Sequence, residues 1–430
     1  MITCITGPDG AGKTTYLRRL LEETLRWTRT SALPARHVGY MPQKFGLYEN
    51  LSVAENLKLY ADLHGVRRGD FAARAERLLA ATNLLRFKSR MAGKLSGGMK
   101  QKLALACALV SEPDTLILDE PTVGVDVVSR RELWAILKSF IEGREMEVFV
   151  STTYADEEDY CDKVIRLGGV LAPAPIPPRT AGPLEGDDAI VAESLVKRFG
   201  DFTAVNDISF TVGRGEIFGL PGANGAGKTT TFRMLCGLDA PTGGRVAIRG
   251  VDLRNAPGVA RGRIGFVAQK FSLYGDLSLA ENLSFFGGAY GLSGTRLTKR
   301  LDWAAAEFGL SRWWRTAAGT LPLGVKQRLA MAAALLHEPD VLFLDEATSG
   351  ADPATRQGFW TRIRALADKG VAVVITTHYL DEAEFCDRMI IMQDGCAVAQ
   401  GSPADIRAAG RSDNLEEAFV TLIRRKEAKP

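Results

Sequence analysis

The sequence contains no hydrophobic run long enough to cross a membrane. Its longest apolar stretches, such as Leu103 to Val110 and Val371 to Ile375, are far shorter than the roughly 20 residues that a spanning helix needs. The N-terminal stretch Met1 to Gly7 has neither a basic segment nor an apolar run of signal-peptide length. We therefore expect a cytoplasmic protein without a membrane-spanning segment.

The chain also lacks a large excess of either charge and any pair of closely spaced cysteines. Lysine and arginine number 54 against 51 aspartate and glutamate, a formal net charge of +3, so the charge gives no reason to expect a nucleic-acid partner. The six cysteines form no CxxC pair, which argues against a structural zinc site and a disulfide framework. With 430 residues, 46% of them hydrophobic, the chain is long enough for two domains with cores of their own.

An internal repeat divides the chain. The stretch KFGLYENLSVAENL, which begins at Lys44, returns as KFSLYGDLSLAENL at Lys270, an offset of 270 − 44 = 226 positions that indicates duplicated domains. Between the copies, the segment from Leu171 to Pro183 contains five prolines and suits a stiff, extended linker. The predicted parts are a first domain at 1–168 (copy one), a linker at 169–188 and a second domain at 189–430 (copy two).

The two copies are unequal. Copy one has no counterpart of the segment from Ala189 to Gly219, so we expect it to lack the N-terminal strands of copy two. Its segment from Lys13 to Gln43 is also shorter than the matching one from Lys228 to Gln269.

Each copy carries a complete phosphate-loop pattern, GPDGAGKT in copy one and GANGAGKT in copy two. Glycines allow backbone N–H groups to surround phosphates at a helix N-terminus, while the lysine reaches the outer phosphates and the threonine can bind magnesium. The residues predicted to bind nucleotide here are Gly7, Pro8, Asp9, Gly10, Ala11, Gly12, Lys13, Thr14 and Thr15 in copy one, and Gly222, Ala223, Asn224, Gly225, Ala226, Gly227, Lys228, Thr229 and Thr230 in copy two.

An unbroken apolar run in each copy ends in two carboxylates, TLILDE at Thr115 and VLFLDE at Val341. Such runs are typical of parallel strands buried on both faces, and ligands bind at the carboxyl ends of these strands. We expect the first acid of each pair, Asp119 or Asp345, to bind magnesium through water. The second, Glu120 or Glu346, suits a general base that polarises the attacking water. The sequence therefore predicts an α/β fold in each copy.

The stretch LSGGMKQ at Leu95 resembles the signature motif of ATP-binding-cassette (ABC) proteins. This resemblance covers nearly the whole chain and implies two phosphate-loop NTPase cassettes, each a mostly parallel sheet with a helical subdomain, that use ATP and Mg²⁺. The roles that it implies are Gln43 and Gln269 as Q-loop glutamines, Asp126 and Asp352 as D-loop aspartates, His378 as the switch histidine, Phe199 as the aromatic beneath adenine, and Thr229, Gln269 and Asp345 (through water) as magnesium ligands.

In ABC proteins two cassettes pack head to tail, so each ATP lies between the phosphate loop of one and the signature of the other. The resemblance therefore implies an intramolecular cassette dimer with two composite sites. Copy two has LPLGVKQ in place of the signature, with Pro322 and Leu323 where copy one has serine and glycine. Copy one has Thr153 opposite His378 and no counterpart of Phe199. Both losses fall on the site that uses the copy-one phosphate loop.

The other site is expected to be complete and catalytic. It combines the copy-two phosphate loop and its catalytic residues Glu346, His378 and Gln269 with the copy-one signature residues Ser96, Gly97 and Gly98. Proline at a first helical position is compatible with a helix, so we expect the helix after the copy-two signature to survive.

The stretches that follow the two Q-loops resemble those of bacterial exporters of drugs and similar hydrophobic compounds. This resemblance implies separately encoded membrane permease subunits as partners, and a peripheral location on the inner face of the cytoplasmic membrane. The alternative is a soluble tandem-cassette ATPase that acts on ribosomes as a translation factor. Those proteins have a long charged linker and two intact signatures, whereas this chain has a short proline-rich linker and one intact signature.

Overall fold

The computed structural model describes residues 1–7, 11–30, 37–168, 186, 188–222, 225–269, 271–348, 353–377 and 380–427. The chain divides into two compact units, Met1–Ala172 and Pro173–Pro430, which are described separately. Most of the predicted linker lies outside the described residues, so the proposed domain boundaries stay a prediction. Within the described ranges, none of the helices has the length and apolar character that a membrane span requires.

Unit 1 contains a parallel sheet with strand order β2-β3-β4-β1-β5. Its strands are β1 (Ile2–Thr6), β2 (Val38–Met41), β3 (Thr115–Asp119), β4 (Glu147–Thr152) and β5 (Lys163–Arg166). Its helices are α1 (Lys13–Thr30), α2 (Val53–Leu63), α3 (Arg68–Ala81), α4 (Gly97–Leu109) and α5 (Val127–Ile141), with 3-10 turns at Leu85–Phe87, Ala92–Lys94 and Ala155–Tyr160.

Unit 2 contains two sheets, one of order β11-β12-β13-β8-β14-β15 and an antiparallel one of order β10-β9-β6-β7. The strands are β6 (Ile190–Phe199), β7 (Phe202–Val212), β8 (Ile217–Pro221), β9 (Gly243–Ile248), β10 (Val251–Asp252), β11 (Ile264–Val267), β12 (Val341–Asp345), β13 (Ala372–Thr377), β14 (Arg388–Gln393) and β15 (Cys396–Gly401). The helices are α6 (Lys228–Leu235), α7 (Pro257–Arg261), α8 (Leu279–Ala289), α9 (Gly294–Glu307), α10 (Leu323–Leu335), α11 (Pro353–Asp368), α12 (Leu380–Ala383), α13 (Pro403–Gly410) and α14 (Leu415–Glu427), with 3-10 turns at Ser311–Trp313 and Ala318–Thr320.

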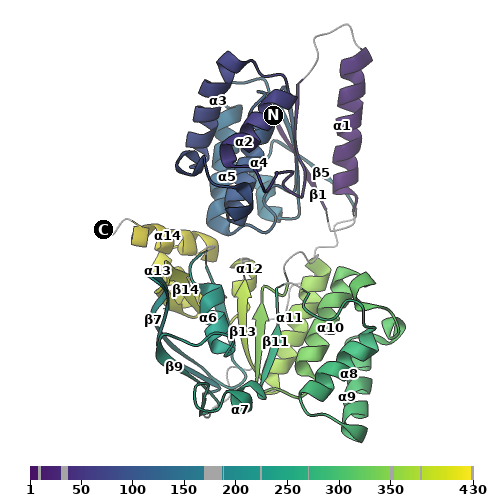
Figure 1. Cartoon of the computed structure of the whole chain (residues 1–430), viewed down its shortest axis with the longest axis vertical. Helices are drawn as coiled ribbons and strands as arrows, with labels where there is room; N and C mark the ends of the chain where they lie inside the picture. The colour runs from purple at the N-terminus through teal and green to yellow at the C-terminus, as the bar shows by residue number, and fades with distance from the viewer. Residues whose placement is uncertain are drawn as a thin grey trace. The chain divides into compact units, whose positions relative to one another are not determined.

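The two parallel sheets have the same strand order, because β2, β3, β4, β1 and β5 correspond in sequence to β11, β12, β13, β8 and β14. The predicted α/β fold is therefore confirmed. Side chains alternate between the faces of the sheet, as strand geometry requires. In β3, Leu116 and Leu118 belong to the core formed with α4 and α5, whereas Ile117 packs toward α1. Figure 1 shows α1 on one side of this sheet and α4 and α5 on the other.

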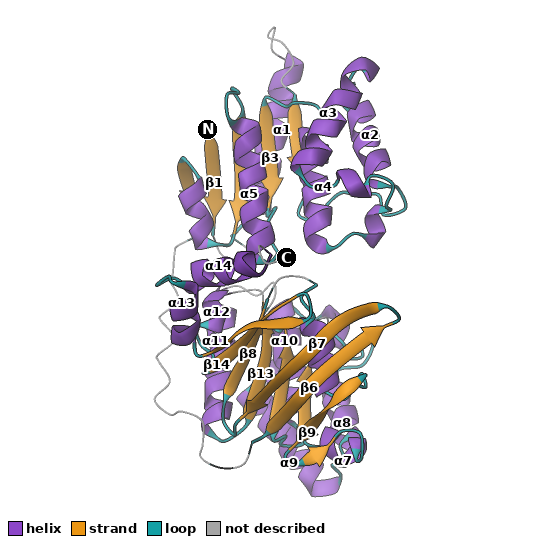
Figure 2. Ribbon diagram, turned by 90° about the vertical axis from the view of Figure 1, so that its left-hand side faces the viewer, coloured by secondary structure: helices purple, strands orange, loops and turns teal. Residues whose placement is uncertain are grey.

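The helix after the phosphate loop is covered differently in the two units. In unit 2, α6 contacts both the parallel sheet and the strands β6 and β7 of the antiparallel sheet, which crosses the unit in Figure 2. The described residues of unit 1 form no counterpart of this antiparallel sheet. The sequence of α1 matches its surroundings: Met234 of α6 is fully buried, whereas Arg19 occupies the matching position of α1 and is exposed.

The surroundings of the phosphate-loop glycines also differ between the two units. Gly12 and Gly227 both have left-handed backbone φ angles, 92° and 97°, which glycine adopts without strain. A Cβ atom on Gly227 would lie 2.6 Å from the carbonyl oxygen of Ala204 in β7, whereas one on Gly12 would meet nothing within 4 Å. The phosphate loop of unit 2 is therefore backed by a strand that the described part of unit 1 does not provide.

We expect unit 1 to open more readily than unit 2 in the full chain. On the α1 face, the fully buried hydrophobic residues of its core are Ile5, Leu17 and Ile117, whereas the matching core of unit 2 extends through α6 and a second sheet. Less buried apolar area means a smaller free energy of local unfolding. Hydrogen exchange should be at least about tenfold faster for the amides of β1 and β3 than for those of β8 and β12. Equal protection of the two sheets would contradict this expectation.

Candidate nucleotide-binding sites

The phosphate-loop lysines begin α1 and α6 and are buried, with 5% of each residue exposed. The Lys13 ammonium donates a hydrogen bond to the carbonyl oxygen of Gly7 at 2.8 Å, and Lys228 donates to the equivalent oxygen of Gly222. The loop thus holds each ammonium at the N-terminal end of a helix, where backbone N–H groups favour an anion. Pro8, Asp9, Gly10, Ala223 and Asn224, which the sequence places in these loops, lie outside the described residues.

The two carboxylates of each copy follow a buried strand, as predicted. Asp119 ends β3 and Asp345 ends β12. The next residues, Glu120 and Glu346, have φ angles of 49° and 47°, a left-handed conformation that costs a non-glycine residue energy and is found often at active sites.

Hydroxyl groups on the neighbouring strands hold this conformation. In unit 1, the Ser151 hydroxyl accepts a hydrogen bond from the backbone N–H of Glu120 at 2.8 Å and donates to the Asp119 carboxylate, also at 2.8 Å. In unit 2, Thr376 accepts from the Glu346 N–H at 3.0 Å and donates to Asp345 at 2.6 Å. Ser151 and Thr376 were not singled out from the sequence. The sequence feature that could have identified them is a hydroxyl residue at the same position of the repeat in both copies.

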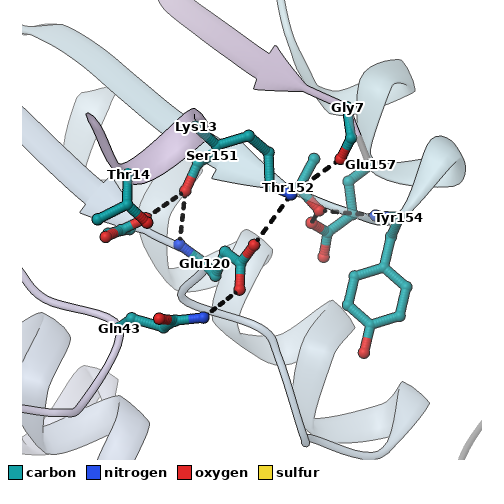
Figure 3. A network of polar contacts seen from close by, with 10 residues as sticks. Gly7, Lys13, Thr14, Gln43, Glu120, Ser151, Thr152, Tyr154 and Glu157 are labelled. Carbon is teal, nitrogen blue, oxygen red and sulfur yellow. Dashed lines mark hydrogen bonds and ion pairs between the residues drawn. The ribbon is translucent and has the colours of Figure 1, made fainter. Parts of the chain in front are cut away.

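The Q-loop glutamines contact the glutamates in both units. The side-chain amide of Gln43 donates to the Glu120 carboxylate at 2.6 Å, and that of Gln269 donates to the Glu346 carboxylate. Lys13 also forms an ion pair with Glu120 at 3.2 Å, so lysine, glutamine and glutamate converge at one point (Figure 3). Residues that are 77 positions apart in the sequence are thereby brought into direct contact.

The signature segments differ at their first helical turn. In unit 1, Ser96 is the N-cap of α4, and its hydroxyl oxygen accepts from the Met99 N–H at 3.3 Å. That bond leaves the hydroxyl proton available to another acceptor. In unit 2, Pro322 caps α10 without any side-chain hydrogen bond, and Leu323 is 51% exposed. The prediction that the helix survives is confirmed, but Pro322 stands at the N-cap, one residue before the first helical position.

Four further residues that the sequence analysis named lie outside the described structure or at its edges. His378 and Asp352 lie outside the described residues, although the preceding Thr377 ends β13. Thr153, which takes the place of His378 in copy one, is half-buried and directly follows β4. Phe199 lies at the tip of the β6–β7 hairpin, 54% exposed, with the Lys197 ammonium 5.2 Å from its ring centre. Its predicted role under adenine stays a prediction.

A buried glutamate in each copy was missed in the sequence. Glu382 is 2% exposed and accepts hydrogen bonds from Thr348, at 2.9 Å, and from Thr377, at 2.7 Å. Glu157 is fully buried at the same place in copy one and accepts from Thr152. In copy two this carboxyl links the segment after Glu346 to the strand end that precedes His378. The presence of a glutamate at this position in both copies of the repeat could have identified the residue from the sequence.

The stability of unit 2 should depend on the protonation of Glu382. Burial raises the pKa of this carboxyl to about 7 from its ordinary value of 4.5, opposed in part by its bonds to Thr348 and Thr377. The folded state therefore holds a proton that the unfolded chain releases as the pH rises from 4.5 to 7, and stability falls across that interval by about 3 kcal/mol. In Glu382→Gln this fall should disappear in thermal melts at pH 5 to 8. The exposed Glu307→Gln is the matched control, and a fall that persists in Glu382→Gln would refute the assignment.

Comparisons with known proteins agree with this geometry. The family model described as ABC transporter matches residues 1–123 and 205–349. The probable multidrug ABC transporter ATP-binding protein YbhF of Escherichia coli K12 is 40% identical over 540 residues, which cover 98% of this chain and 92% of that protein. The Nod factor export ATP-binding protein I of Burkholderia lata is 43% identical over 212 residues, which cover 49% of this chain and 69% of that protein.

A solved structure described as an ATP-binding subunit of an ABC transporter is similar over 54% of this chain and 99% of its own, with 32% identity and a TM-score of 0.51. The alignment with YbhF spans 540 positions, so at least 110 of them (540 − 430) have no residue in this chain. A first cassette that is smaller than the second is consistent with those gaps. The matched family, the full-length relative and the paired phosphate-loop sites together show that this chain belongs to the ABC transporter family, as an ATP-hydrolysing subunit with tandem cassettes.

Proposed function

We propose that this protein drives an exporter of drugs or other hydrophobic compounds, in which separate membrane permease subunits carry the cargo. The observation that carries the proposal is the alignment with YbhF, a probable multidrug transporter ATP-binding protein. It covers 98% of this chain at 40% identity. The chain itself supplies the ATPase machinery, since both units bring a phosphate-loop lysine, a Q-loop glutamine and a glutamate to the same strand ends.

Catalysis is proposed at the phosphate loop of copy two. The Glu346 carboxylate, held by the amide of Gln269, accepts the proton of the water that attacks the γ-phosphate, and ADP leaves. Lys228 and the helix end of α6 stabilise the phosphate charge. His378 and the copy-one residues Ser96, Gly97 and Gly98 complete the proposed site. The other site combines the copy-one loop and Thr153 with Pro322 and Leu323, and is proposed to be degenerate.

The residues at the strand ends suit Mg²⁺, which prefers oxygen ligands. In unit 1 the Thr14 hydroxyl lies 3.1 Å from the Asp119 carboxylate, so a hard donor pair is already assembled. The matching donors of copy two are Thr229, Gln269 and Asp345, the last through water. When bound, the metal ion would neutralise charge on the β- and γ-phosphates.

The proposed location is the inner face of the cytoplasmic membrane, where permease subunits hold the protein. Affinity purification of the tagged chain from detergent-solubilised membranes, followed by mass spectrometry, tests this directly. We expect a protein of about six apolar segments of roughly 20 residues each to be recovered with it. Recovery with ribosomes instead, and loss of that association in Glu346→Gln, would favour the translation-factor alternative.

A further inference from the structure

A cavity of about 440 Å³ in unit 2 is lined by residues of α10 and α11. Figure 1 labels these two helices. Val325, Met331 and Phe359 provide apolar walls, Gly358 lines the side formed by α11, and two guanidinium groups, those of Arg328 and Arg362, face the space. The volume falls in the range of about 300 to 1,000 Å³ that small-molecule sites occupy. Pro322 and Gly324 of the copy-two signature also line the cavity, so it borders the segment assigned to the degenerate site. None of the residues proposed for ATP hydrolysis at the copy-two phosphate loop lines it.

The two arginines are only partly satisfied by the protein. Arg328 donates from Nη1 to the carbonyl oxygen of Phe308 at 2.8 Å and from Nε to that of Gly324 at 3.3 Å, and Arg362 donates from Nη1 to that of Gly358 at 3.1 Å. A guanidinium has five N–H donors, so each arginine keeps several for another partner. Among the residues that the structure describes, no carboxylate forms an ion pair with either arginine. Burial, followed by the charge of Arg362, lowers the pKa of Arg328.

The matching place in copy one shows what has changed. There, Lys102 of α4 forms an ion pair with Glu132 of α5, which joins the two helices. At the same offset of 226 positions, Arg328 replaces Lys102, Gly358 replaces Glu132 and Arg362 replaces Ile136. Copy two has therefore lost the anion, gained a second cation and opened the space that the glutamate side chain fills.

Two neighbouring cations without a counter-charge repel one another, and both arginines are half-buried, so each loses part of its contact with water. Glycine within a helix is also unfavourable relative to alanine, so Gly358 adds no stability of its own. We propose that this cavity binds an organic anion with an apolar body, its carboxylate or phosphate head group between Arg328 and Arg362 and its apolar part against Val325, Met331 and Phe359. Such a ligand restores, from outside, the link between the helices that Lys102 and Glu132 form in copy one.

Isothermal titration calorimetry of the full chain tests this proposal with four probes: octanoate, octyl phosphate, octanol and inorganic phosphate, each as a monomer in solution. We expect one site for octanoate, for octyl phosphate or for both, and the stronger of the two identifies the head group. Octanol should bind at least about tenfold more weakly, because it lacks the charge-assisted hydrogen bonds. Inorganic phosphate is the control for binding of a phosphate group at the phosphate loops.

Gly358→Glu is the decisive variant because it returns the carboxylate of copy one to the cavity. A Cβ atom at this position would lie 3.5 Å from Nη1 of Arg362, an ordinary contact, so the variant should fold. Its affinity for the anions should fall by at least about tenfold without a loss of thermal stability, and Arg328→Gln should show a fall of about ten- to a hundredfold. Glu132→Gln, which breaks the matching pair in copy one, should leave the affinity unchanged. Equal binding of octanoate and octyl phosphate to wild type and Gly358→Glu, or no binding of either at millimolar concentration, would overturn the proposal.

Discussion

Replacing Glu346 by glutamine is expected to lower the ATPase rate by about 10²- to 10⁴-fold, the usual contribution of a general base. The amide keeps the shape of the carboxylate and its position beside Gln269, but it cannot accept the proton of the attacking water. The same change at Glu120 is expected to cost no more than a fewfold in rate. The measurement is steady-state ATP hydrolysis by the full chain with the proposed membrane permease subunits present.

The expected difference cannot come from the local geometry of the two glutamates. Both have left-handed backbone angles, both accept a hydrogen bond from a Q-loop glutamine, and both donate their backbone N–H to a hydroxyl of the neighbouring strand. The proposal assigns the difference to what surrounds them, namely the histidine at position 378 and the intact signature for one, and Thr153 and the LPLG segment for the other. Equal losses in Glu120→Gln and Glu346→Gln would mean that both sites hydrolyse ATP.

The signature segments should show the reciprocal pattern. Ser96→Arg is expected to abolish ATP hydrolysis, because a long cationic side chain would fill the place where the serine hydroxyl and the first turn of α4 are proposed to receive the γ-phosphate. Pro322→Arg should leave the rate nearly unchanged, since Pro322 already offers neither a hydroxyl nor an N–H to a phosphate.

In Ser96→Arg and Pro322→Arg, an effect on protein stability must be distinguished from an effect on catalysis. Loss of the Ser96 cap would by itself destabilise α4 by about 1 kcal/mol. Ser96→Thr keeps both the cap and the hydroxyl, so it should retain activity, while the thermal stability of each variant is measured alongside its rate. An inactive Pro322→Arg variant with unchanged stability would show that the copy-two signature takes part in hydrolysis.

Much of the site could be predicted because its residues follow strong local patterns. An unbroken apolar run precedes the two carboxylates at the end of β3 and of β12, which predicts a strand buried on both faces. The carboxyl end of such a strand lies at the edge where parallel sheets bind ligands. The Q-loop roles of Gln43 and Gln269 were implied only by family resemblance. Their contacts with those carboxylates were not predicted, since no local pattern relates residues so far apart in sequence.

Other features depend on what surrounds a residue, and the sequence alone does not contain that information. Glu157 and Glu382 lie in acidic stretches of the sequence with no local pattern that indicates burial, yet each is buried against threonine hydroxyls. The cavity beside Gly358 arises from three separate substitutions that only the packing of α10 on α11 brings together. The length of α1, 18 residues against 8 in α6, reflects the absence of a turn into an antiparallel sheet within the described part of unit 1.

The central claim is that hydrolysis occurs at the phosphate loop of copy two. Trapping photoreactive azido-ATP with vanadate during turnover, then cross-linking it and cleaving the chain within the proline-rich linker, measures which copy holds the trapped nucleotide. We predict that the label is found in the fragment from residue 189 to residue 430 and that Glu346→Gln removes the vanadate dependence of labelling. Equal trapping in both fragments, or trapping mainly in the fragment that contains Lys13 and Glu120, would contradict the account.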